Sequence, residues 1–256
     1  MPVRVASGAP SALTARRSDR LLHPDCLRQG KTDYKDTNMA TADLPLADLR
    51  LELAPAVADA AAFDGWNETA VDAAAQAAGV DPALARFAFR GGAMEMIEAW
   101  IARTDADMAR AFPAGWAEGV SIRERIRRLV QFRLDTVAHQ REALRRALAI
   151  MAMPQNAAQA LRRGWRTADA MWRLAGDTAV DYNHYTKRTI LAGIYAATLG
   201  VFVNDSSDDF ADTRAFLDRR IEGVMRFEKA KARIVRPDAE RFSMVRLLGR
   251  LRYPAA

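Results

Sequence analysis

The chain is organised around residues 181–220, which read DYNHYTKRTILAGIYAATLGVFVNDSSDDFADTRAFLDRR. This segment begins with an aromatic and basic cluster, continues as the most apolar run of the sequence, and turns through a polar loop into an amphipathic stretch. Its apolar or neutral part, residues 190–203, has 14 residues, whereas a transmembrane helix needs roughly 17–25. We therefore expect a soluble protein in which this helix is buried on several sides and pairs with the next helix as an antiparallel hairpin.

The composition of the whole chain favours an all-α fold. Half of the 256 residues are hydrophobic, and segments of alternating Val, Ile and Thr are scarce. Cys26 is the only cysteine and the three histidines lie far apart, so we expect no disulfide and no metal site. Paired carboxylates and an activated nucleophile are not recognisable either. We expect no catalytic residues and no cofactor, and a helical enzyme is only the third hypothesis.

The N-terminal part of the folded chain has the pattern of a helix-turn-helix. Helices are predicted at residues 46–63, 69–78, from 82 to about 90, and 93–112. Asn67 is a suitable N-cap for the second helix, and Pro82 stands at the first position of the third. Short helices joined by glycine turns and followed by a long helix resemble the TetR family of repressors.

The charges in this part argue against DNA binding. Residues 64–90 contain four acidic side chains and two arginines, and the third helix, PALARFAF, has no Asn, Gln, Lys, Ser or Thr to read base edges. Residues 41–115 as a whole carry 12 acids against 5 arginines. We therefore expect a degenerate helix-turn-helix and no nucleic-acid partner. A TetR-type transcriptional regulator with a hydrophobic ligand is the alternative.

The middle of the chain is rich in adaptable apolar side chains. Ser121 is the predicted cap of a long arginine-rich helix that bends near His139 and ends before Pro154, and another helix is expected at residues 155–174. Methionine and tryptophan side chains here suit ordinary core packing or a cavity for a long apolar ligand. The predicted lipid-binding residues are Met151, Met153, Trp165, Ile194, Tyr195 and Leu199.

Residues 182–188 combine two tyrosines, a histidine and two cations, which is typical of an exposed interface. The alternative is a helix start with solvated Lys and Arg side chains. After the turn at residues 204–207, Ser206 with Asp209 reads as a capping-box variant.

Five motifs carry a resemblance to a known family: MPQN at 153–156, AGD at 175–177, YNHYTKR at 182–188, GIY at 193–195, and the DSS-DF-DT-FL pattern at 205–217. Together they resemble the accessory family of coenzyme Q (ubiquinone) biosynthesis that is the ninth of the Coq proteins. The similarity extends over roughly residues 46–225.

This resemblance implies a TetR-like all-helical homodimer that has lost DNA binding. It also implies an apolar cavity for an isoprenoid quinone intermediate or a phospholipid, and an accessory role in which the lipid is presented to demethoxyubiquinone hydroxylase or another ubiquinone hydroxylase. The partner-facing patch of the family falls on Met171, Trp172, Asp181, Asn183, His184, Tyr185 and Arg188. His184 departs from the tryptophan expected in eukaryotic members, so the identity of the partner stays open.

The two ends of the chain differ from the rest. Residues 1–40 read as an unstructured extension, either a transit peptide or an upstream extension before a true start at Met39, and we favour the second interpretation. Residues 226–252 carry 9 basic against 3 acidic side chains. A short helix at residues 239–252 is amphipathic and basic, which predicts a membrane-surface helix, although docking on the protein's own core is the commoner role of such helices. The predicted membrane-binding residues are Met244, Leu247, Leu248, Leu251, Arg246 and Arg250.

The expected organisation has four parts. They are an extension at 1–40, a helix-turn-helix-like subdomain at 41–112, a lipid-binding and dimerisation domain at 113–228, and a basic linker with the membrane helix at 229–256. The expected location is cytoplasmic and peripheral at the inner membrane in a bacterium, or the matrix face of the mitochondrial inner membrane in a eukaryote.

Overall fold

The computed structural model describes residues 44–177 and 182–234, apart from the side chains of Tyr182, Asn183, Met225 and residues 227–234. Within these ranges every regular element is a helix, so the predicted all-α class is confirmed. The predicted N-terminal extension and the amphipathic C-terminal helix lie outside the described residues. No helix in the described ranges combines the length and the apolar character that a membrane span requires.

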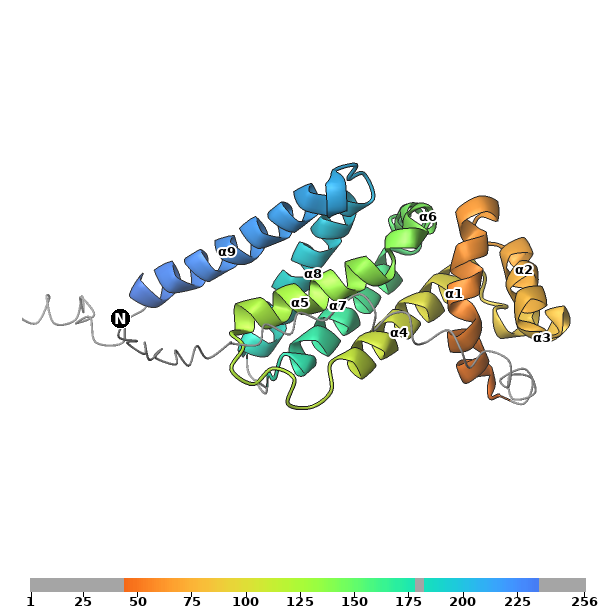
Figure 1. Cartoon of the computed structure of the whole chain (residues 1–256), viewed down its shortest axis with the longest axis horizontal. Helices are drawn as coiled ribbons and strands as arrows, with labels where there is room; N and C mark the ends of the chain where they lie inside the picture. The colour runs from red at the N-terminus through yellow and green to blue at the C-terminus, as the bar shows by residue number, and fades with distance from the viewer. Residues whose placement is uncertain (1–43, 178–181, 235–256) are drawn as a thin grey trace, which may run out of the picture.

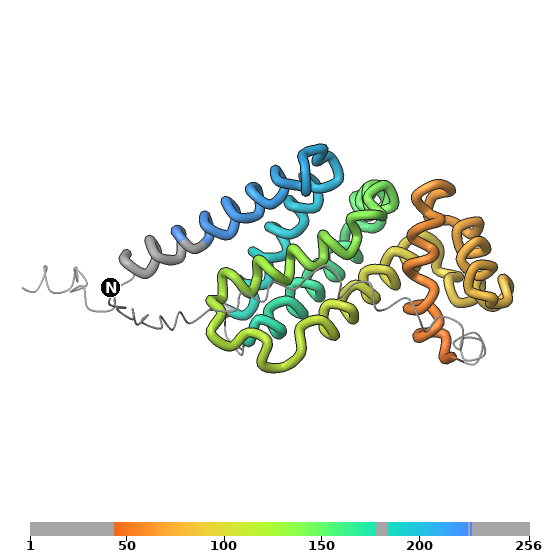
Figure 2. Tube along the Cα trace, in the orientation of Figure 1, coloured from red at the N-terminus to blue at the C-terminus, as the bar shows by residue number. Residues whose placement is uncertain are grey.

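The helices follow one another along the chain. In chain order they are α1 (Leu46–Asp64), α2 (Glu68–Ala78), α3 (Pro82–Ala88), α4 (Ala93–Ala111), α5 (Ile122–Thr136), α6 (Arg141–Met151), α7 (Ala157–Leu174), α8 (Tyr182–Phe202) and α9 (Ala211–Ile234), with 3-10 turns η4 (Ala138–Gln140) and η5 (Asp208–Phe210). Helices α1, α2 and α3 form a group at one end of the molecule, and α9 extends toward the other end (Figure 1). The Cα trace shows α4 leading from that group into the remaining helices (Figure 2).

Local sequence signals fix the boundaries of the first helices. The Asn67 side chain accepts a hydrogen bond from the backbone N–H of Ala70 at 3.2 Å, and Asp81 accepts one from Ala83 at 2.9 Å. Gly79 ends α2 in the left-handed conformation (φ 67°), which a residue with a Cβ rarely adopts. These caps produce the helix-turn-helix geometry that the sequence predicts.

Two tryptophans join this group to the rest of the core. Trp66 is buried, its ring centroid lies 5.5 Å from that of Trp100 in α4, and its Nε1 donates to the carbonyl oxygen of Ala143 in α6 at 3.0 Å. Trp100 Nε1 donates to Gln140 Oε1 at 2.9 Å. The buried apolar side chains form one continuous cluster from α1 to α9.

The expected bend near His139 is present and has a specific cause. The 3-10 turn η4 separates α5 from α6, and it buries the Gln140 side chain. Gln140 Nε2 donates to the carbonyl oxygen of Pro55 at 3.0 Å and to Asp59 at 2.7 Å, so the turn is fastened to α1. His139 itself is largely exposed.

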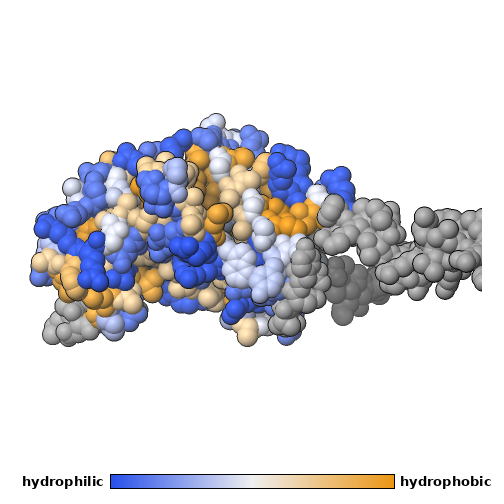
Figure 3. Space-filling view, turned by 180° about the vertical axis from the view of Figure 1, so that it is seen from behind, coloured by the Kyte–Doolittle hydropathy of each residue, from blue (hydrophilic) through white to orange (hydrophobic). Residues whose placement is uncertain are grey.

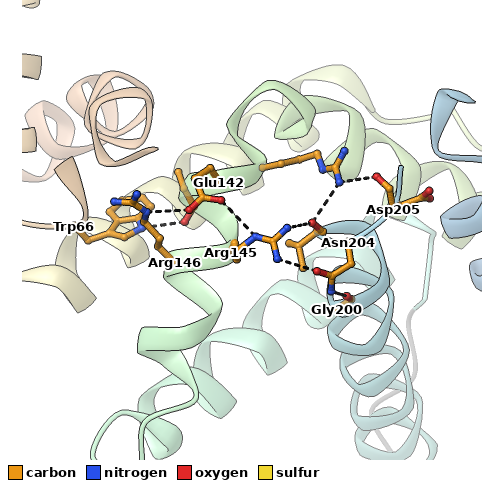
Figure 4. A network of polar contacts seen from close by, with 10 residues as sticks. Trp66, Glu142, Arg145, Arg146, Gly200, Asn204 and Asp205 are labelled. Carbon is orange, nitrogen blue, oxygen red and sulfur yellow. Dashed lines mark hydrogen bonds and ion pairs between the residues drawn. The ribbon is translucent and has the colours of Figure 1, made fainter. Parts of the chain in front are cut away.

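Charged side chains of α6 link that helix to the C-terminal ends of α1 and α8 (Figure 4). Arg145 donates to Asn204 Oδ1 at 2.8 Å at the end of α8, and Arg146 donates to the carbonyl oxygen of Phe63 at 3.0 Å at the end of α1. Glu142 forms ion pairs with both arginines, at 3.4 Å to Arg145 and 3.1 Å to Arg146. These contacts hold the α1 end and the α8 end at a fixed separation along α6.

The turn between α8 and α9 is organised around a buried carboxylate. Asp205 accepts hydrogen bonds from the backbone N–H of Ser207 and of Thr213, both at 2.8 Å, and from both hydroxyl groups. Burial raises the pKa of Asp205, but these four hydrogen bonds outweigh it and leave the pKa far below its ordinary value. The predicted capping box of Ser206 with Asp209 is therefore wrong, because Asp205 and Ser207 are the residues that cap the start of α9.

Helix α8 is less enclosed than expected. Leu191, Thr198 and Phe202 are buried, whereas the small residues Gly193, Ala196, Ala197 and Gly200 are exposed in the single chain. The prediction of burial on several sides is wrong for this face.

Candidate functional site

A cavity of about 570 Å³ lies among α4, α5, α6, α7 and α8. Its volume is typical of small-molecule sites, which span roughly 300–1,000 Å³. Small residues on the facing sides of α7 and α8 leave the space open, because Ala160, Gly164, Ala192 and Gly193 have little or no side chain to fill it. The larger apolar residues of the wall include Ile97, Trp100, Val137, Leu144 and Leu148.

Four of the six predicted lipid-binding residues contribute to this wall: Met151, Trp165, Tyr195 and Leu199. Met153 does not, since it lies in the turn after α6 with 42% of its surface exposed. Ile194 does not either, because it precedes Tyr195 on the helix and packs against the core instead. For these two residues the predicted place in the cavity wall is wrong.

The cavity opens to the surface between α7 and α8. Leu161 of α7 lines the cavity and is 75% exposed, and Thr189, Gly193 and Ala196 of α8 both line it and are exposed. Seen from the side opposite to Figure 1, apolar side chains reach the surface between polar ones near the middle of the molecule (Figure 3). We call the opening at Leu161, Thr189, Gly193 and Ala196 the mouth of the cavity.

An aromatic group stands beside the mouth. The ring of Trp165 lies 6.0 Å from that of His184 and 6.3 Å from that of Tyr185, measured between centroids. Tyr185 is 62% exposed. The predicted interface cluster at the start of α8 and the predicted lipid site on α7 therefore meet at one place.

The cavity wall also contains charged groups that the sequence interpretation missed. Arg133 of α5 donates to Tyr195 Oη at 3.0 Å and to Asp105 of α4, and Arg163 of α7 donates to the second oxygen of Asp105 at 3.1 Å. Thr167 donates to the same oxygen at 3.4 Å. We call Asp105, Arg133, Arg163, Thr167 and Tyr195 the polar centre. The position of Arg133 within an otherwise apolar helical stripe was the one available signal.

Two residues of the predicted partner-facing patch are inside the protein. Arg188 is 1% exposed; its Nε donates to Asp169, and its Nη1 donates to Asp177 at 3.1 Å. Met171 is completely buried. The prediction that these two side chains meet a partner is wrong, because aspartates from α7 and from its C-terminal end draw Arg188 inward and Met171 faces the core.

The other members of that patch lie near the surface or outside the described residues. Trp172 is partly buried, and its Nε1 donates to the carbonyl oxygen of Lys187 at 3.0 Å while the Lys187 ammonium lies 5.4 Å above its ring. His184 is partly buried at the edge of the mouth. Asp181, the Asn183 side chain and the predicted membrane residues 244–251 are outside the described residues.

The titratable groups of the site are few. Within the described part of the chain, no three His, Cys, Asp or Glu side chains come together as a metal site would require. The charged groups of the polar centre are arginines and one carboxylate that is already hydrogen bonded to them.

Comparison with known proteins agrees with the family that the motifs indicated. Residues 157–228 match the COQ9 family model. The predicted resemblance is confirmed. The rat protein named ubiquinone biosynthesis protein COQ9, mitochondrial (Rattus norvegicus), is 35% identical over 168 residues, or 63% of this chain and 54% of that protein. The human protein of the same name (Homo sapiens) is 33% identical over 168 residues, or 63% of this chain and 52% of that protein.

The COQ9 similarity covers a defined share of each chain. A fly protein of that name (Drosophila melanogaster) is 24% identical over 226 residues, which are 87% of this chain and 65% of that protein. The chain spans about half the length of the rat and human COQ9 proteins it matches.

The TetR-like fold is confirmed by a solved structure. The crystal structure of a TetR transcriptional regulator from Nitrosomonas europaea matches with a TM-score of 0.56 and 24% identity, over 70% of this chain and 98% of that one. At this level of identity the match concerns the fold alone.

Proposed function

We propose that this chain is a non-enzymatic, lipid-binding accessory protein of ubiquinone biosynthesis. It binds an isoprenoid quinone intermediate or a phospholipid at the membrane and presents it to a ring hydroxylase. The observation that carries this proposal is the apolar cavity with its mouth between α7 and α8. The names of the COQ9 relatives supply the pathway.

The mouth is the natural place for a partner to dock. The residues around the mouth or close to it are mainly aromatic: His184, Tyr185 and Trp172, with Lys187 over the Trp172 ring. Aromatic residues are enriched in protein interfaces. A hydroxylase that covers this rim would receive the lipid without exposing it to water. Demethoxyubiquinone hydroxylase is the first candidate partner, and another ubiquinone hydroxylase is the second. Ala197 and Gly200 of α8, which are exposed and lie outside the cavity wall, belong to the proposed surface for homodimerisation through α8 and α9.

DNA binding, the activity of a TetR-type regulator, has weak support in this chain. Arg86 on α3 forms a bidentate ion pair with Asp72 at 2.6 and 2.7 Å, so its guanidinium is already engaged. Arg90 lies over the ring of Phe87. Phe87 is 53% exposed and lies on α3, the helix that would have to read base edges. A regulator must bind duplex DNA in a salt-dependent manner, and we expect this chain not to do so.

Native mass spectrometry of the purified protein, with extraction of bound lipid, tests the proposal. The matched variants are Gly193→Phe, which places a ring in the cavity wall, and Gln76→Phe at an exposed position of α2 outside that wall. A Cβ added at Gly193 meets no atom within 4 Å, so the change does not force the backbone to move. We expect bound isoprenoid or phospholipid in the wild type and in Gln76→Phe, and its loss in Gly193→Phe. Wild-type protein without any bound lipid contradicts the proposal.

A further inference from the structure

The wall of the cavity is apolar almost everywhere, and its polar part is concentrated in the polar centre. Arg133, Arg163, Thr167 and Tyr195 all contribute to the wall. An apolar lipid tail gains nothing from two guanidinium groups in its binding site, and burying such groups is costly unless they are paired. The polar centre therefore calls for an explanation beyond the containment of a hydrocarbon chain.

The carboxylate of the polar centre is shared between the two arginines. One oxygen of Asp105 accepts from Arg133, and the other accepts from Arg163 at 3.1 Å and from Thr167 at 3.4 Å. Two cations and one anion leave an excess of one positive charge among these groups. Burial lowers the pKa of Arg163, and the nearby charges of Arg133 and Arg166 lower it further. The attraction of Asp105 and Glu98 raises it but offsets only part of that effect.

One donor of the polar centre is left unpaired. The Nε of Arg163 is buried and has no hydrogen-bond partner within residues 44–177 and 182–234. A buried donor without an acceptor is unfavourable, and more so when it carries charge. The Nε of Arg141 is also unpaired among the described residues, but that guanidinium lies over the rings of Phe202 and Phe210, which contact each other, and does not line the cavity.

We propose that the polar centre is a headgroup site that receives an oxyanion, such as a carboxylate, carried by a single-chain amphiphile. The ligand enters head first, its oxygen accepts a hydrogen bond from Arg163, and its chain runs toward the mouth at Leu161. A small rotation of the long Arg163 side chain brings its donors to the ligand. This inference rests on the proposed lipid-binding function and specifies the ligand class for that same cavity.

Size and charge both narrow the ligand class. A cavity of about 570 Å³ holds a headgroup and part of one chain, so the remainder of a long chain extends through the mouth. Charge-assisted hydrogen bonds are roughly twice as strong as neutral ones, so an anionic head is preferred over a hydroxyl head of equal chain length. The expected preference is roughly tenfold or more in dissociation constant.

The test compares dodecanoate with dodecan-1-ol in titrations of the full chain at pH 7.5, followed by tryptophan fluorescence, because Trp100 and Trp165 line the cavity. Arg163→Met removes the charged donor with little loss of length. Arg162→Met is the matched control, since Arg162 is the exposed neighbour on the same helix. We expect the wild type and Arg162→Met to prefer the acid by roughly tenfold, and Arg163→Met to bind both probes within about twofold of each other. Dodecyl phosphate as a third probe separates phosphate heads from carboxylate heads, and tighter binding of either anion than of the alcohol supports the site.

The outcomes test the headgroup site and the lipid-binding function separately. If the wild type binds dodecanoate and dodecyl phosphate no more tightly than dodecan-1-ol, or if Arg163→Met keeps the wild-type preference, the headgroup site is overturned and the lipid-binding function stands. Failure of all three probes to bind the wild type overturns both. If Arg163→Met binds no probe at all, Arg163→Gln replaces it, since glutamine keeps a hydrogen-bond donor beside Asp105 without the charge. An acid preference of wild-type size in that variant, with the alcohol still bound, counts against the site.

Discussion

The buried position of Arg188 makes a strong prediction about stability. Its guanidinium is 1% exposed and forms hydrogen bonds to Asp169, to Asp177 at 3.1 Å and to the carbonyl oxygen of His184 at 3.1 Å. Arg188→Met keeps the length of the side chain but removes the charge, which leaves two carboxylates without their shared cation. Removing one partner of a buried ion pair costs roughly 3–5 kcal/mol.

Urea unfolding followed by circular dichroism measures this loss. With an m-value of about 2 kcal/mol/M, a loss of roughly 3–5 kcal/mol lowers the urea midpoint by about 1.5–2.5 M. The control is Arg162→Met on α7, where an exposed arginine is replaced and the expected change is within about 0.5 kcal/mol.

The same cluster predicts a dependence on pH. Burial raises the pKa of Asp177, but hydrogen bonds from Lys187 and Arg188 outweigh it and hold the pKa below its ordinary value. A carboxyl group whose pKa is lowered by folding stabilises the protein above its ordinary pKa, near pH 4, and this contribution is lost as the pH falls through the lower folded value. The free energy of unfolding of the wild type should therefore fall below about pH 4, and part of that fall should be absent in Arg188→Met.

An unchanged urea midpoint in Arg188→Met would refute the reasoning. It would mean that the guanidinium is solvated in solution and free to meet a partner, as the family resemblance implied.

Three further results are expected. Trp66→Ala should lower the free energy of unfolding by roughly 3–5 kcal/mol in urea titrations, because it empties a buried site and removes the hydrogen bond to Ala143, whereas Phe63→Ala, at an 85% exposed side chain, should change it little. Asp205→Ala should lower the melting temperature clearly, because it leaves four hydrogen-bond donors without their acceptor. The control Asp208→Ala, at an exposed position, should not lower it. Equal melting temperatures for the two variants would argue against the Asp205 cap. Deletion of residues 236–256 should abolish cosedimentation with anionic liposomes and leave the circular dichroism spectrum of the helical part intact, and unchanged cosedimentation would exclude the tail as the membrane anchor.

Local signals predicted much of the fold. Asn67 is a cap whose chemistry acts within four residues, so it could be recognised in the sequence, and its side chain caps the start of α2. The bend after α5 was expected near His139, but its cause, the hydrogen bonds from Gln140 to α1, joins positions more than eighty residues apart and cannot be recognised locally.

The candidate site was predictable only in its apolar part. Trp165 and Tyr195 could be proposed from side-chain type and helical position, and both line the cavity. Arg188 was assigned to the partner-facing patch because the family resemblance implies it, and only the folded chain brings Asp169 and Asp177 to its guanidinium. Asp105 and Arg163 were missed for the same reason, since their pairing depends on how α4 and α7 pack.

The polar centre also bears on the kinetics of a carrier. A protein that hands its ligand to another must release it quickly, and differences in affinity between related complexes arise mainly in the dissociation rate. A head held by Arg163 has to break that contact before the chain can slide out past Leu161. The number of hydrogen bonds at the polar centre therefore sets the residence time of the ligand, and a partner that competes for the same oxygen would act as the trigger for delivery.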